Sequence, residues 1–538
     1  MRRVLLDREV RLKACAAGVA DRRAERRSGS AALQGCLVIA VVGMTASAIA
    51  QAIDPAAGLT LDDVVKATLR DNPSIQIAAR QADNERGVYV AAGDPFDARV
   101  QTSFGTNRFN SLQADAAGSP SPWLELSQTQ YTVSWQKQLR QGIVVAPELD
   151  VSRTALPALG VQPTSQATAK LNLIVPLLKD RGGVVTAASE RAASRSYDAL
   201  KLQTEHIAAQ AVLTAVSAYW DYQSAIARLD ILADSETRAQ RLLDDTRKLV
   251  EAGERPPSDL RQVQGNAAAK RVTRVSAEQS VVDARVRLGL LMGLGPAETA
   301  ALRATTTPFP AAAAADAGTL AAPALVDVAV AQRADLRATE KSVESTRMIF
   351  DAARENLKPR VDLVSSIGYA GLQVGGNNVG SLVSPVFSNV PGPDVAVSFR
   401  YQWATANVGA RGALLQSESA YEQQRIARED LQRQIRTGVY QAVEAIGRHA
   451  AAMSDAHDAV TFYQETVRSE QRKFQLGVST LFDTIQAADA LTNVRLSEIT
   501  AERDYAVALA TLRYQTGSLV VAGAQGAVVV VERLLSPR

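Results

Sequence analysis

The residue types that most often carry catalysis or bind metals are scarce in this chain and poorly placed for either task. Among 538 residues there are three His and two Cys. His449 and His457 are eight positions apart, about 12 Å along a helix, which is too far for one shared metal. His206 stands alone among Ala, Gln and Glu, and Gly182-Gly183 is not followed by the Lys-Ser/Thr of a phosphate-binding loop. The sequence therefore predicts no enzyme, no metal site and no cofactor.

Carboxylates occur in a pattern that repeats along the chain. Gly253 and Gly477 are each followed six residues later by an Asp, at Asp259 and Asp483, and each Gly lies between two helical stretches. A carboxylate one turn inside a helix interacts favourably with the positive end of the helix dipole. Ser258 is a candidate cap for the first of these helices. The pattern alone thus predicts carboxylates at two helix starts.

The first 50 residues have the pattern of a signal peptide. Residues 1–27 contain nine Arg or Lys and four Asp or Glu, and residues 28–50 carry no charge. The apolar run ends in Ala48-Ile49-Ala50, the small-x-small pattern of a signal-peptidase site, so cleavage is expected after Ala50. An uncleaved membrane anchor is the alternative, although the run is short for a span of about 20 residues. Cleavage would remove Cys15 and Cys36, and the overall charge of +3 argues against nucleic-acid binding.

Long helices dominate the remaining sequence, which falls into two corresponding halves. Val184 to Ala252 contains neither Gly nor Pro over 69 residues, enough for a helix of about 100 Å. Small and apolar residues recur there at coiled-coil spacing, which predicts packing along other long helices. Residues 64–105 and 325–366 align without a gap at an offset of 261, which indicates an internal duplication. The expected parts are repeats at 51–294 and 325–518, a Pro- and Ala-rich linker at 295–324 and a tail at 519–538.

Alternating apolar and polar residues predict strands inside both halves. The runs are Val100–Phe104, Tyr131–Trp135, Ile143–Val151, Leu171–Val175, Val361–Tyr369 and Val395–Trp403. The longer runs approach the length of about 9–11 residues that a tilted membrane strand needs. So few strands cannot close a barrel alone, and an open strand edge is not tolerated in lipid, so the chain is expected to oligomerise. An ordinary half-buried sheet and a solvated coiled-coil rod are the alternatives.

The duplicated order of helix, strands, very long helix, Gly-turn-Asp and helix resembles the outer membrane efflux protein family, the TolC-like channels. The resemblance covers roughly residues 58–518, and its most specific piece is Lys473–Asp483, supported by Leu59–Pro73 and Ala218–Asp221. It implies a mostly helical fold with membrane β-structure. Very long antiparallel helices would form a trimeric α-helical tunnel, and about four strands per subunit would share a β-barrel of about 12 strands. Residues 129–153 look like an additional hairpin and depart from that pattern, so the subunit is expected to carry either more than four strands or a longer external loop.

The same resemblance implies an outer-membrane channel of a tripartite efflux or type I secretion system. Such a homotrimer conducts solutes passively from the periplasm to the exterior, and a large part of it lies in the periplasm. Its implied partners are outer-membrane lipid, a periplasmic adaptor (membrane fusion protein) and an inner-membrane exporter, either proton-driven or of the ABC type. A periplasmic adaptor or a soluble coiled-coil scaffold of an export complex is the alternative function.

In that family the helical hairpins end at the periplasmic entrance, which implies roles for both Gly-to-Asp segments. The implied residues are Gly253, Gly477 and Ser479 for adaptor contact, and Asp259, Asp483 and Phe474 for the gate. Repeated by three-fold symmetry, the carboxylates would ring the entrance and favour cations. Arg472 or Lys473 would supply the opposing charge. A departure from the family is Ser479, which stands where the family places a basic residue shortly after the glycine.

Overall fold

A computed structural model describes the chain over residues 58–111, 124–157, 160–311, 321–376, 380, 384–387, 391–523 and 526–536. The signal peptide expected at residues 1–50 lies outside the described residues. So does part of the linker expected at 295–324, of which 312–320 are not described.

In the described part of the first half of the chain, two α-helices precede a group of strands in the sequence and three follow it. They are α2 (Leu61–Asp71), α3 (Pro73–Ala91), α4 (Ala188–Glu251), α5 (Pro257–Leu291) and α6 (Pro296–Ala300). Thr60 and Asp63 form a capping box at the start of α2. Asn72 caps α3, and Pro73 takes its first position, where a missing N–H has no cost. Because no Gly or Pro interrupts it, α4 continues for 64 residues.

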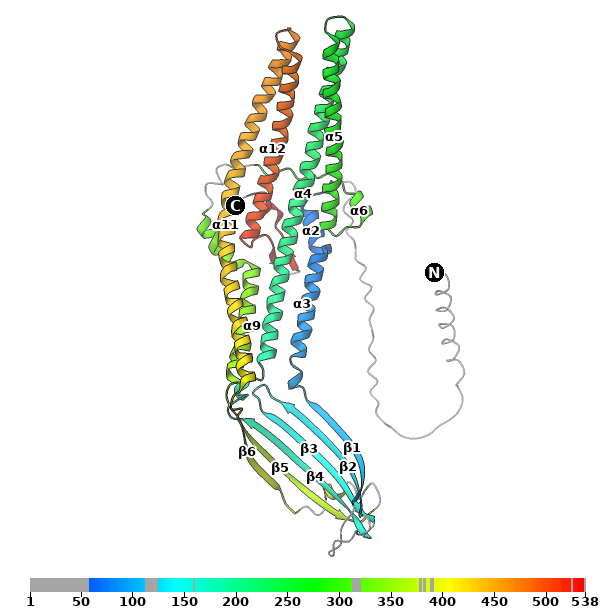
Figure 1. The fold of residues 1–538 in the computed structure, drawn as a ribbon, viewed down its shortest axis with the longest axis vertical. Coiled ribbons are helices and arrows are strands. Elements are labelled where there is room, and N and C mark those ends of the chain that lie inside the picture. The colour runs from blue at the N-terminus through cyan, green and yellow to red at the C-terminus, as the bar shows by residue number, and fades with distance from the viewer. Residues whose placement is uncertain are drawn as a thin grey trace, which may run out of the picture. The chain divides into compact units, whose positions relative to one another are not determined.

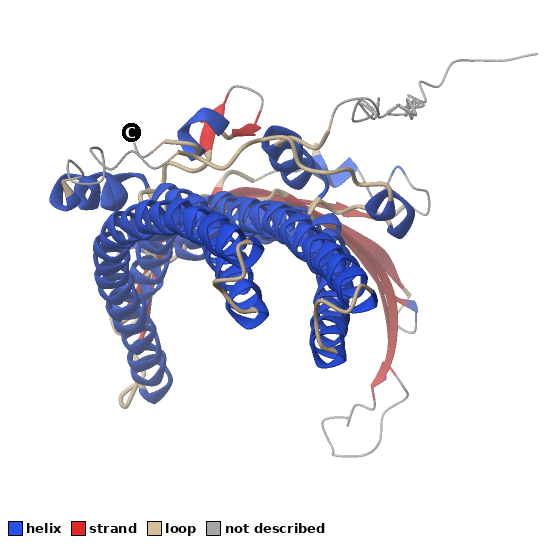
Figure 2. Ribbon diagram, turned by 90° about the horizontal axis from the view of Figure 1, so that it is seen from above, coloured by secondary structure: helices blue, strands red, loops and turns tan. Residues whose placement is uncertain are grey.

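The second half follows the same order of helices. It contains α8 (Ala322–Gln332), α9 (Ala334–Glu355), α11 (Val408–Gln475) and α12 (Leu481–Gln515). The long helices contact one another in the order α5, α4, α12, α11, and nearer the strands in the order α3, α4, α9, α11. Seen from above they stand in a curved row (Figure 2). Figure 1 shows the strands at one end of this row and the two hairpin ends at the other.

In each half, a glycine without room for a side chain follows the last long helix. Gly293 follows α5 with φ +76°, and a Cβ there would lie 2.3 Å from the carbonyl oxygen of Asp71, the last residue of α2. Gly517 follows α12 with φ +71°, and a Cβ there would lie 3.1 Å from the backbone nitrogen of Arg333, between α8 and α9. α5 thus ends against the break between α2 and α3, and α12 ends against the break between α8 and α9.

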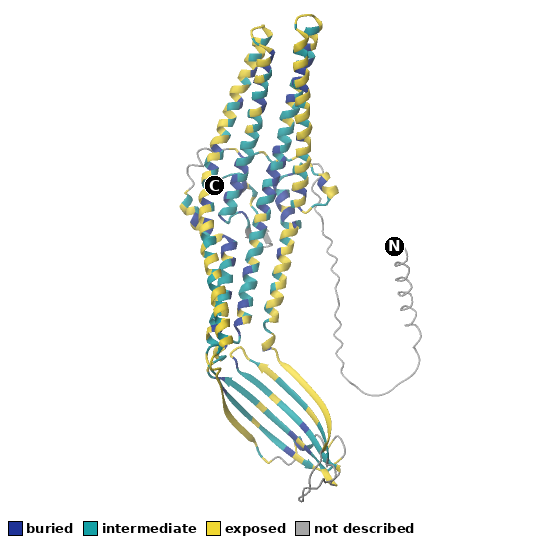
Figure 3. Cartoon of the chain, in the orientation of Figure 1, coloured by how far each residue is buried: buried dark blue, intermediate teal, exposed yellow. Residues whose placement is uncertain are grey.

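The strands form one six-stranded antiparallel sheet in sequence order. They are β1 (Arg99–Ser111), β2 (Leu124–Gln138), β3 (Val144–Leu156), β4 (Val161–Pro176), β5 (Arg360–Val374) and β6 (Asp394–Gln402). The described chain therefore has two strands more than the expected number of about four, and β2 and β3 are the hairpin expected at 129–153. The edge strands β1 and β6 are exposed along their length (Figure 3).

The strand register gives the sheet one apolar and one polar face, because successive residues of a strand point to opposite sides. Pairs on the apolar face are Val100 with Trp135, Val133 with Leu149, Leu171 with Ile367 and Leu363 with Phe399. Pairs on the polar face are Ser103 with Thr132, Ser134 with Glu148, Asp150 with Thr168 and Asn172 with Ser366. The sheet is thus suited to separate an apolar from an aqueous environment.

Short elements complete the described chain. They are η1 (Asp94–Phe96), η3 (Arg181–Gly183), η4 (Ser384–Val386), η5 (Val531–Leu534) and the two-stranded sheet of β7 (Val521–Gly523) and β8 (Gly526–Val528).

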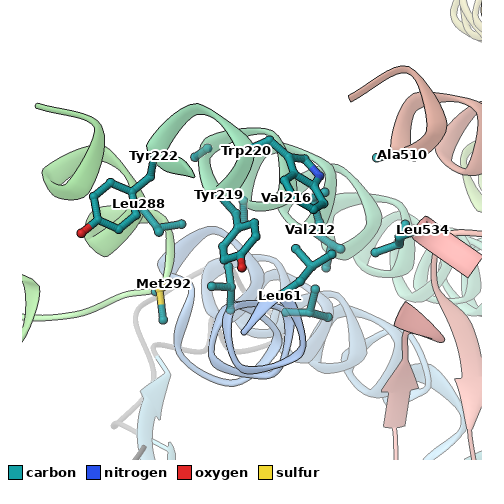
Figure 4. Packing of buried hydrophobic residues seen from close by; sticks show 14 of the residues in the cluster. Leu61, Val212, Val216, Tyr219, Trp220, Tyr222, Leu288, Met292, Ala510 and Leu534 are labelled. Carbon is teal, nitrogen blue, oxygen red and sulfur yellow. The ribbon is translucent and has the colours of Figure 1, made fainter. Parts of the chain in front are cut away.

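A buried apolar cluster lies where α2, α4 and α5 meet (Figure 4). Tyr219 and Trp220 of α4 have no exposed surface. The Tyr219 hydroxyl donates to the carbonyl oxygen of Leu59 at 3.2 Å and accepts from the backbone N–H of Thr307 at 3.2 Å. The Trp220 ring stacks on Phe309 with 5.4 Å between ring centres. The start of the expected linker is therefore packed against the helices.

Candidate functional site at the helical hairpin ends

The first hairpin end connects α4 to α5 through a turn that requires glycine. Gly253 has φ +77°, a left-handed conformation that costs glycine little. The backbone N–H of Glu254 donates to the carbonyl oxygen of Leu249 at 2.9 Å, which satisfies a terminal helix carbonyl. Pro256 takes the N-cap position of α5. The expectation that Ser258 caps this helix is therefore wrong, because the prolines place the helix start two residues earlier.

The second hairpin end repeats this turn between α11 and α12. Gly477 has φ +74°, and the N–H of Val478 donates to the carbonyl oxygen of Lys473 at 2.9 Å. A side chain at either Gly253 or Gly477 would meet nothing within 4 Å. Leu476 and Val478 are each 78% exposed, so the loop presents apolar surface to the solvent.

Asp483 is held by the start of its own helix. It forms a capping box with Thr480, whose hydroxyl donates to Asp483 Oδ2 at 2.6 Å and whose N–H donates at 3.1 Å. The Asp483 N–H donates to Thr480 Oγ1 at 3.2 Å. These bonds from Thr480 hold the pKa of Asp483 below its ordinary value. The spacing Thr480-x-x-Asp483 is a capping-box signature that the sequence analysis missed.

Asp259 occupies the third position of α5 without a side-chain cap. Its carboxylate lies 3.6 Å from Nη1 of Arg255, one turn earlier, and Ser258 Oγ lies 3.4 Å from Asp259 Oδ1. Asp259 and Asp483 thus lie at equivalent positions of α5 and α12 but have different partners.

Phe474 connects the two hairpins. The guanidinium carbon of Arg255 lies 4.8 Å from the centre of the Phe474 ring, the geometry of a cation–π contact. Phe474 also packs against a buried cluster formed by α4, α5 and α12. The members of that cluster are Ala239, Leu243, Val263, Ala267 and Leu481. The cation that faces Phe474 therefore comes from the other hairpin, which no local spacing in the sequence indicates.

Ser479 and Lys473 share a carboxylate that the sequence analysis did not single out. Ser479 Oγ donates to Glu470 Oε2 at 2.8 Å, and Lys473 Nζ lies 2.7 Å from Glu470 Oε1. The bonds from Lys473 and Ser479 hold the pKa of Glu470 below its ordinary value. Lys473, expected to oppose the Asp carboxylates, is thus paired with Glu470 in this structure.

Further ion pairs join the α4–α5 hairpin to the α11–α12 hairpin, at some distance from the hairpin ends. Lys270 of α5 lies 2.6 Å from Asp489 of α12, and Arg503 of α12 lies 2.6 Å from Asp221 of α4. Between these helices is a hollow of about 570 Å³ whose lining includes Arg228, Asp221 and Arg503. The facing surfaces of the two hairpins are therefore polar along this stretch.

The three histidines lie on the long helices α4 and α11. His457 Nδ1 lies 3.0 Å from Glu498, and His206 Nδ1 lies 3.7 Å from Asp335. Within the described ranges, no three His, Cys, Asp or Glu side chains come together as a metal site would require. Among the helices that the structure describes, none is long and apolar enough to cross a bilayer.

Very long antiparallel helices that continue into a two-faced sheet define the class of TolC-like channel folds. A sequence profile described as outer membrane efflux protein matches residues 64–294 and 325–518, more than half of the chain. The chain belongs to the outer membrane efflux protein family, a family of channels and not of enzymes. No curated protein sequence matches it.

Solved structures share the fold at low sequence identity. The outer membrane protein VceC of Vibrio cholerae has a TM-score of 0.60 at 15% identity, over 85% of this chain and 96% of VceC. The CmeC outer membrane channel of Campylobacter jejuni has a TM-score of 0.61 at 12% identity, over 85% of each chain. The MtrE outer membrane channel of Neisseria gonorrhoeae in its open state has a TM-score of 0.57 at 16% identity, over 85% of this chain and 88% of MtrE. These similarities show the fold.

Proposed function

We propose that the chain is the outer-membrane channel of a tripartite efflux or type I secretion system and conducts solutes passively to the exterior as a homotrimer. The observation that carries this proposal is the two-faced sheet at the end of the long helices. Its apolar face suits lipid, and its polar face suits a water-filled lumen. A hollow of about 790 Å³ is lined mostly by apolar residues of this face, among them Trp135, Leu149 and Ile367, and also by Glu148 and Lys170.

The edges of the sheet support a shared barrel. In the described chain, β1 and β6 each pair with one neighbour only. Unpaired backbone groups are too costly in a bilayer, so each edge needs the opposite edge of another subunit. The curved row of long helices would then continue the lumen as a tunnel through the periplasm.

The hairpin ends would form the periplasmic entrance and the contact with the adaptor, which couples the channel to an inner-membrane exporter. Gly253, Gly477 and Ser479 would mark the adaptor surface, together with the exposed Leu476 and Val478. The gate would contain Asp259, Asp483 and Phe474.

The chain organisation belongs to the same proposal. Residues 1–50 would be a cleaved signal peptide, 51–294 and 325–518 two duplicated halves, 295–324 their linker and 519–538 a tail. The channel would need no cofactor and would catalyse no reaction.

Two adjacent residues of β6 test the proposal because they belong to opposite faces. Val397 lies on the apolar face and Ser398 on the polar face. Arginine in the lipid-facing band costs about 2–4 kcal/mol at mid-membrane, whereas a lumen position tolerates it. We expect Val397→Arg to abolish conducting trimers in planar bilayers and Ser398→Arg to retain them. Equal tolerance of both variants, or a wild-type chain that is monomeric in detergent-free buffer, would favour an adaptor or a soluble scaffold.

A further inference from the structure

We propose that three subunits close a barrel of 18 strands, six from each, which admits bulky hydrated solutes that a 12-stranded barrel excludes. This inference rests on the proposed channel function and concerns the width of its outer part. Its basis is the β2–β3 hairpin, which lies within the sheet and not outside it as a surface loop.

Pairing shows that the hairpin separates β1 from β4. β1 pairs with β2 from Arg99 opposite Gln136 to Ser111 opposite Leu124, which is its entire length. β3 pairs with β4 from Val144 opposite Ile174 onward. An external loop would leave β1 free to pair with β4, but here the hairpin occupies that position.

The hairpin has the same two faces as the rest of the sheet. On the polar face, Asp150 accepts hydrogen bonds from Gln130 Nε2 at 2.6 Å and Thr132 Oγ1 at 2.8 Å. Glu148 on the same face lies 3.6 Å from Lys170 of β4. The hairpin therefore adds a hydrogen-bonding wall with two carboxylates to the proposed lumen, and its apolar side continues the lipid-facing band.

The turn of the hairpin is held where the sheet meets the helices. Arg140 donates two hydrogen bonds to Glu190 at the start of α4, at 2.7 and 2.5 Å, and its guanidinium carbon lies 4.9 Å from the centre of the buried Phe96 ring. Thr186 donates to the carbonyl oxygen of Arg140 at 2.6 Å.

Glycine is required at two points of this junction. Gly142 has φ +92°, and a Cβ there would lie 2.1 Å from the carbonyl oxygen of Asp180. A Cβ at Gly183 would lie 2.7 Å from the carbonyl oxygen of Arg140. The β2–β3 turn and the loop before α4 therefore approach each other too closely for side chains at these two positions. A loosely attached hairpin would not require glycine there.

Strand number sets the width of the pore. Barrel diameter grows roughly in proportion to strand number, so 18 strands give a diameter about 1.5 times that of a 12-stranded barrel. Barrels of about 16–18 strands leave an open aqueous channel. With Gln, Thr and Ser in the lining, the solutes admitted are large and well hydrated.

Polymer exclusion in planar bilayers measures this width on the full mature trimer. Polyethylene glycols of increasing size are added to one side at a time, and the largest polymer that still lowers conductance gives the radius of each mouth. The comparison variant lacks residues 112–156, so β1 joins β4 through 157–160 and four strands per subunit remain. We expect the cut-off radius at the barrel mouth to be about 1.5 times larger for the wild type.

The outcomes separate this inference from the channel function. Conductance with equal cut-off radii for wild type and deletion variant would overturn the 18-stranded barrel and leave the channel function standing. If the deletion variant does not assemble, electron microscopy of the wild-type trimer in lipid decides, because 18 strands support the inference and 12 overturn it. Absence of any conductance, together with a monomeric chain, would overturn the channel function and this inference with it.

Discussion

The guanidinium group of Arg255 lies over the ring of Phe474, 4.8 Å from its centre, although the two residues belong to different helical hairpins. Arg255 also lies 3.6 Å from the carboxylate of Asp259. One side chain thus joins the turn of the first hairpin, the carboxylate of its second helix and the aromatic residue at the end of the other hairpin. If the hairpin ends move apart to open the proposed entrance, this contact must break.

Replacing Arg255 should ease opening. Arg255→Ala removes a cation–π contact of about 0.5–1 kcal/mol, enough to change an open-to-closed ratio about two- to fivefold. We expect a higher open probability in single-channel recordings. Arg261→Ala is the matched control, because Arg261 is an exposed arginine of α5 in the same hairpin. Recordings that do not distinguish the two variants would contradict a role of Arg255 in closure.

The capping box at Asp483 allows its structural and electrostatic effects to be separated. Thr480→Ala removes the capping hydroxyl, at a cost of about 1 kcal/mol, and leaves the charge of Asp483 in place. We expect Thr480→Ala and Asp483→Ala both to raise conductance by loosening the start of α12. Only Asp483→Ala should also lower the preference for cations, measured as a reversal potential in a salt gradient. Unchanged ion selectivity in the Asp259→Ala/Asp483→Ala double variant would refute a carboxylate ring.

Stability should depend on pH through a buried cluster at the break between α8 and α9. Burial is the main cause that lowers the pKa of His206, although Asp335 opposes it. Burial alone would raise the pKa of Asp335, but the hydrogen bond and charge of Arg333 outweigh it and keep that pKa low. A group with a depressed pKa gives stability that is complete above its unfolded value, about 6.5 for His, and is lost as pH falls through the folded value.

His206→Gln should therefore flatten the pH dependence of unfolding. We expect the Tm of the wild type, followed by circular dichroism, to fall as the pH drops below about 6.5, and that of the variant to fall less. Asp335→Asn leaves Arg333 buried without its carboxylate and should cost about 3 kcal/mol at neutral pH. Parallel pH profiles for wild type and His206→Gln would assign the loss of stability to other groups.

Arg140 of the β2–β3 turn and Glu190 of α4 should be energetically coupled in their effect on stability. Arg140→Glu and Glu190→Arg each place like charges together and should lower the Tm of the protein. The double variant restores opposite charges and should recover part of the loss. Strictly additive losses would mean that the contact does not hold the hairpin in place.

The carboxylates of the added hairpin should affect ion selectivity. Glu148→Gln and Asp150→Asn remove negative charge from the polar face, so the cation preference of the reconstituted channel should decrease. Ser152→Asn, on the same face of β3, is the control that changes size without changing charge. An unchanged reversal potential in the first two variants would place these carboxylates away from the conducting path.

Local patterns in the sequence predicted much of the fold. The alternation of Tyr131, Val133 and Trp135 predicted a strand of the added hairpin, and the absence of Gly and Pro predicted the length of α4. The start of α5 was harder to place, because Pro256 and Pro257 put it two residues before the position expected from Ser258 as the cap.

The contacts within the candidate site could not be predicted as well. Phe474 was singled out, but its partner Arg255 lies on the other hairpin, and pairing across that distance depends on helix packing and not on spacing. Glu470 is one turn before Phe474 and resembles many exposed helix carboxylates. Glu470 belongs to the site because the loop conformation brings Ser479 within hydrogen-bond distance of its carboxylate.

The two unpaired edges of the sheet also constrain how the protein is made. The long helices bury their apolar residues against one another within a single subunit, so they can fold in water as each chain emerges. In the proposed shared barrel, β1 and β6 could not enter a bilayer until each met a strand of another copy. Membrane insertion of that barrel would then be a concerted last step. A subunit without its partners would carry two unpaired edge strands that must be shielded from aggregation.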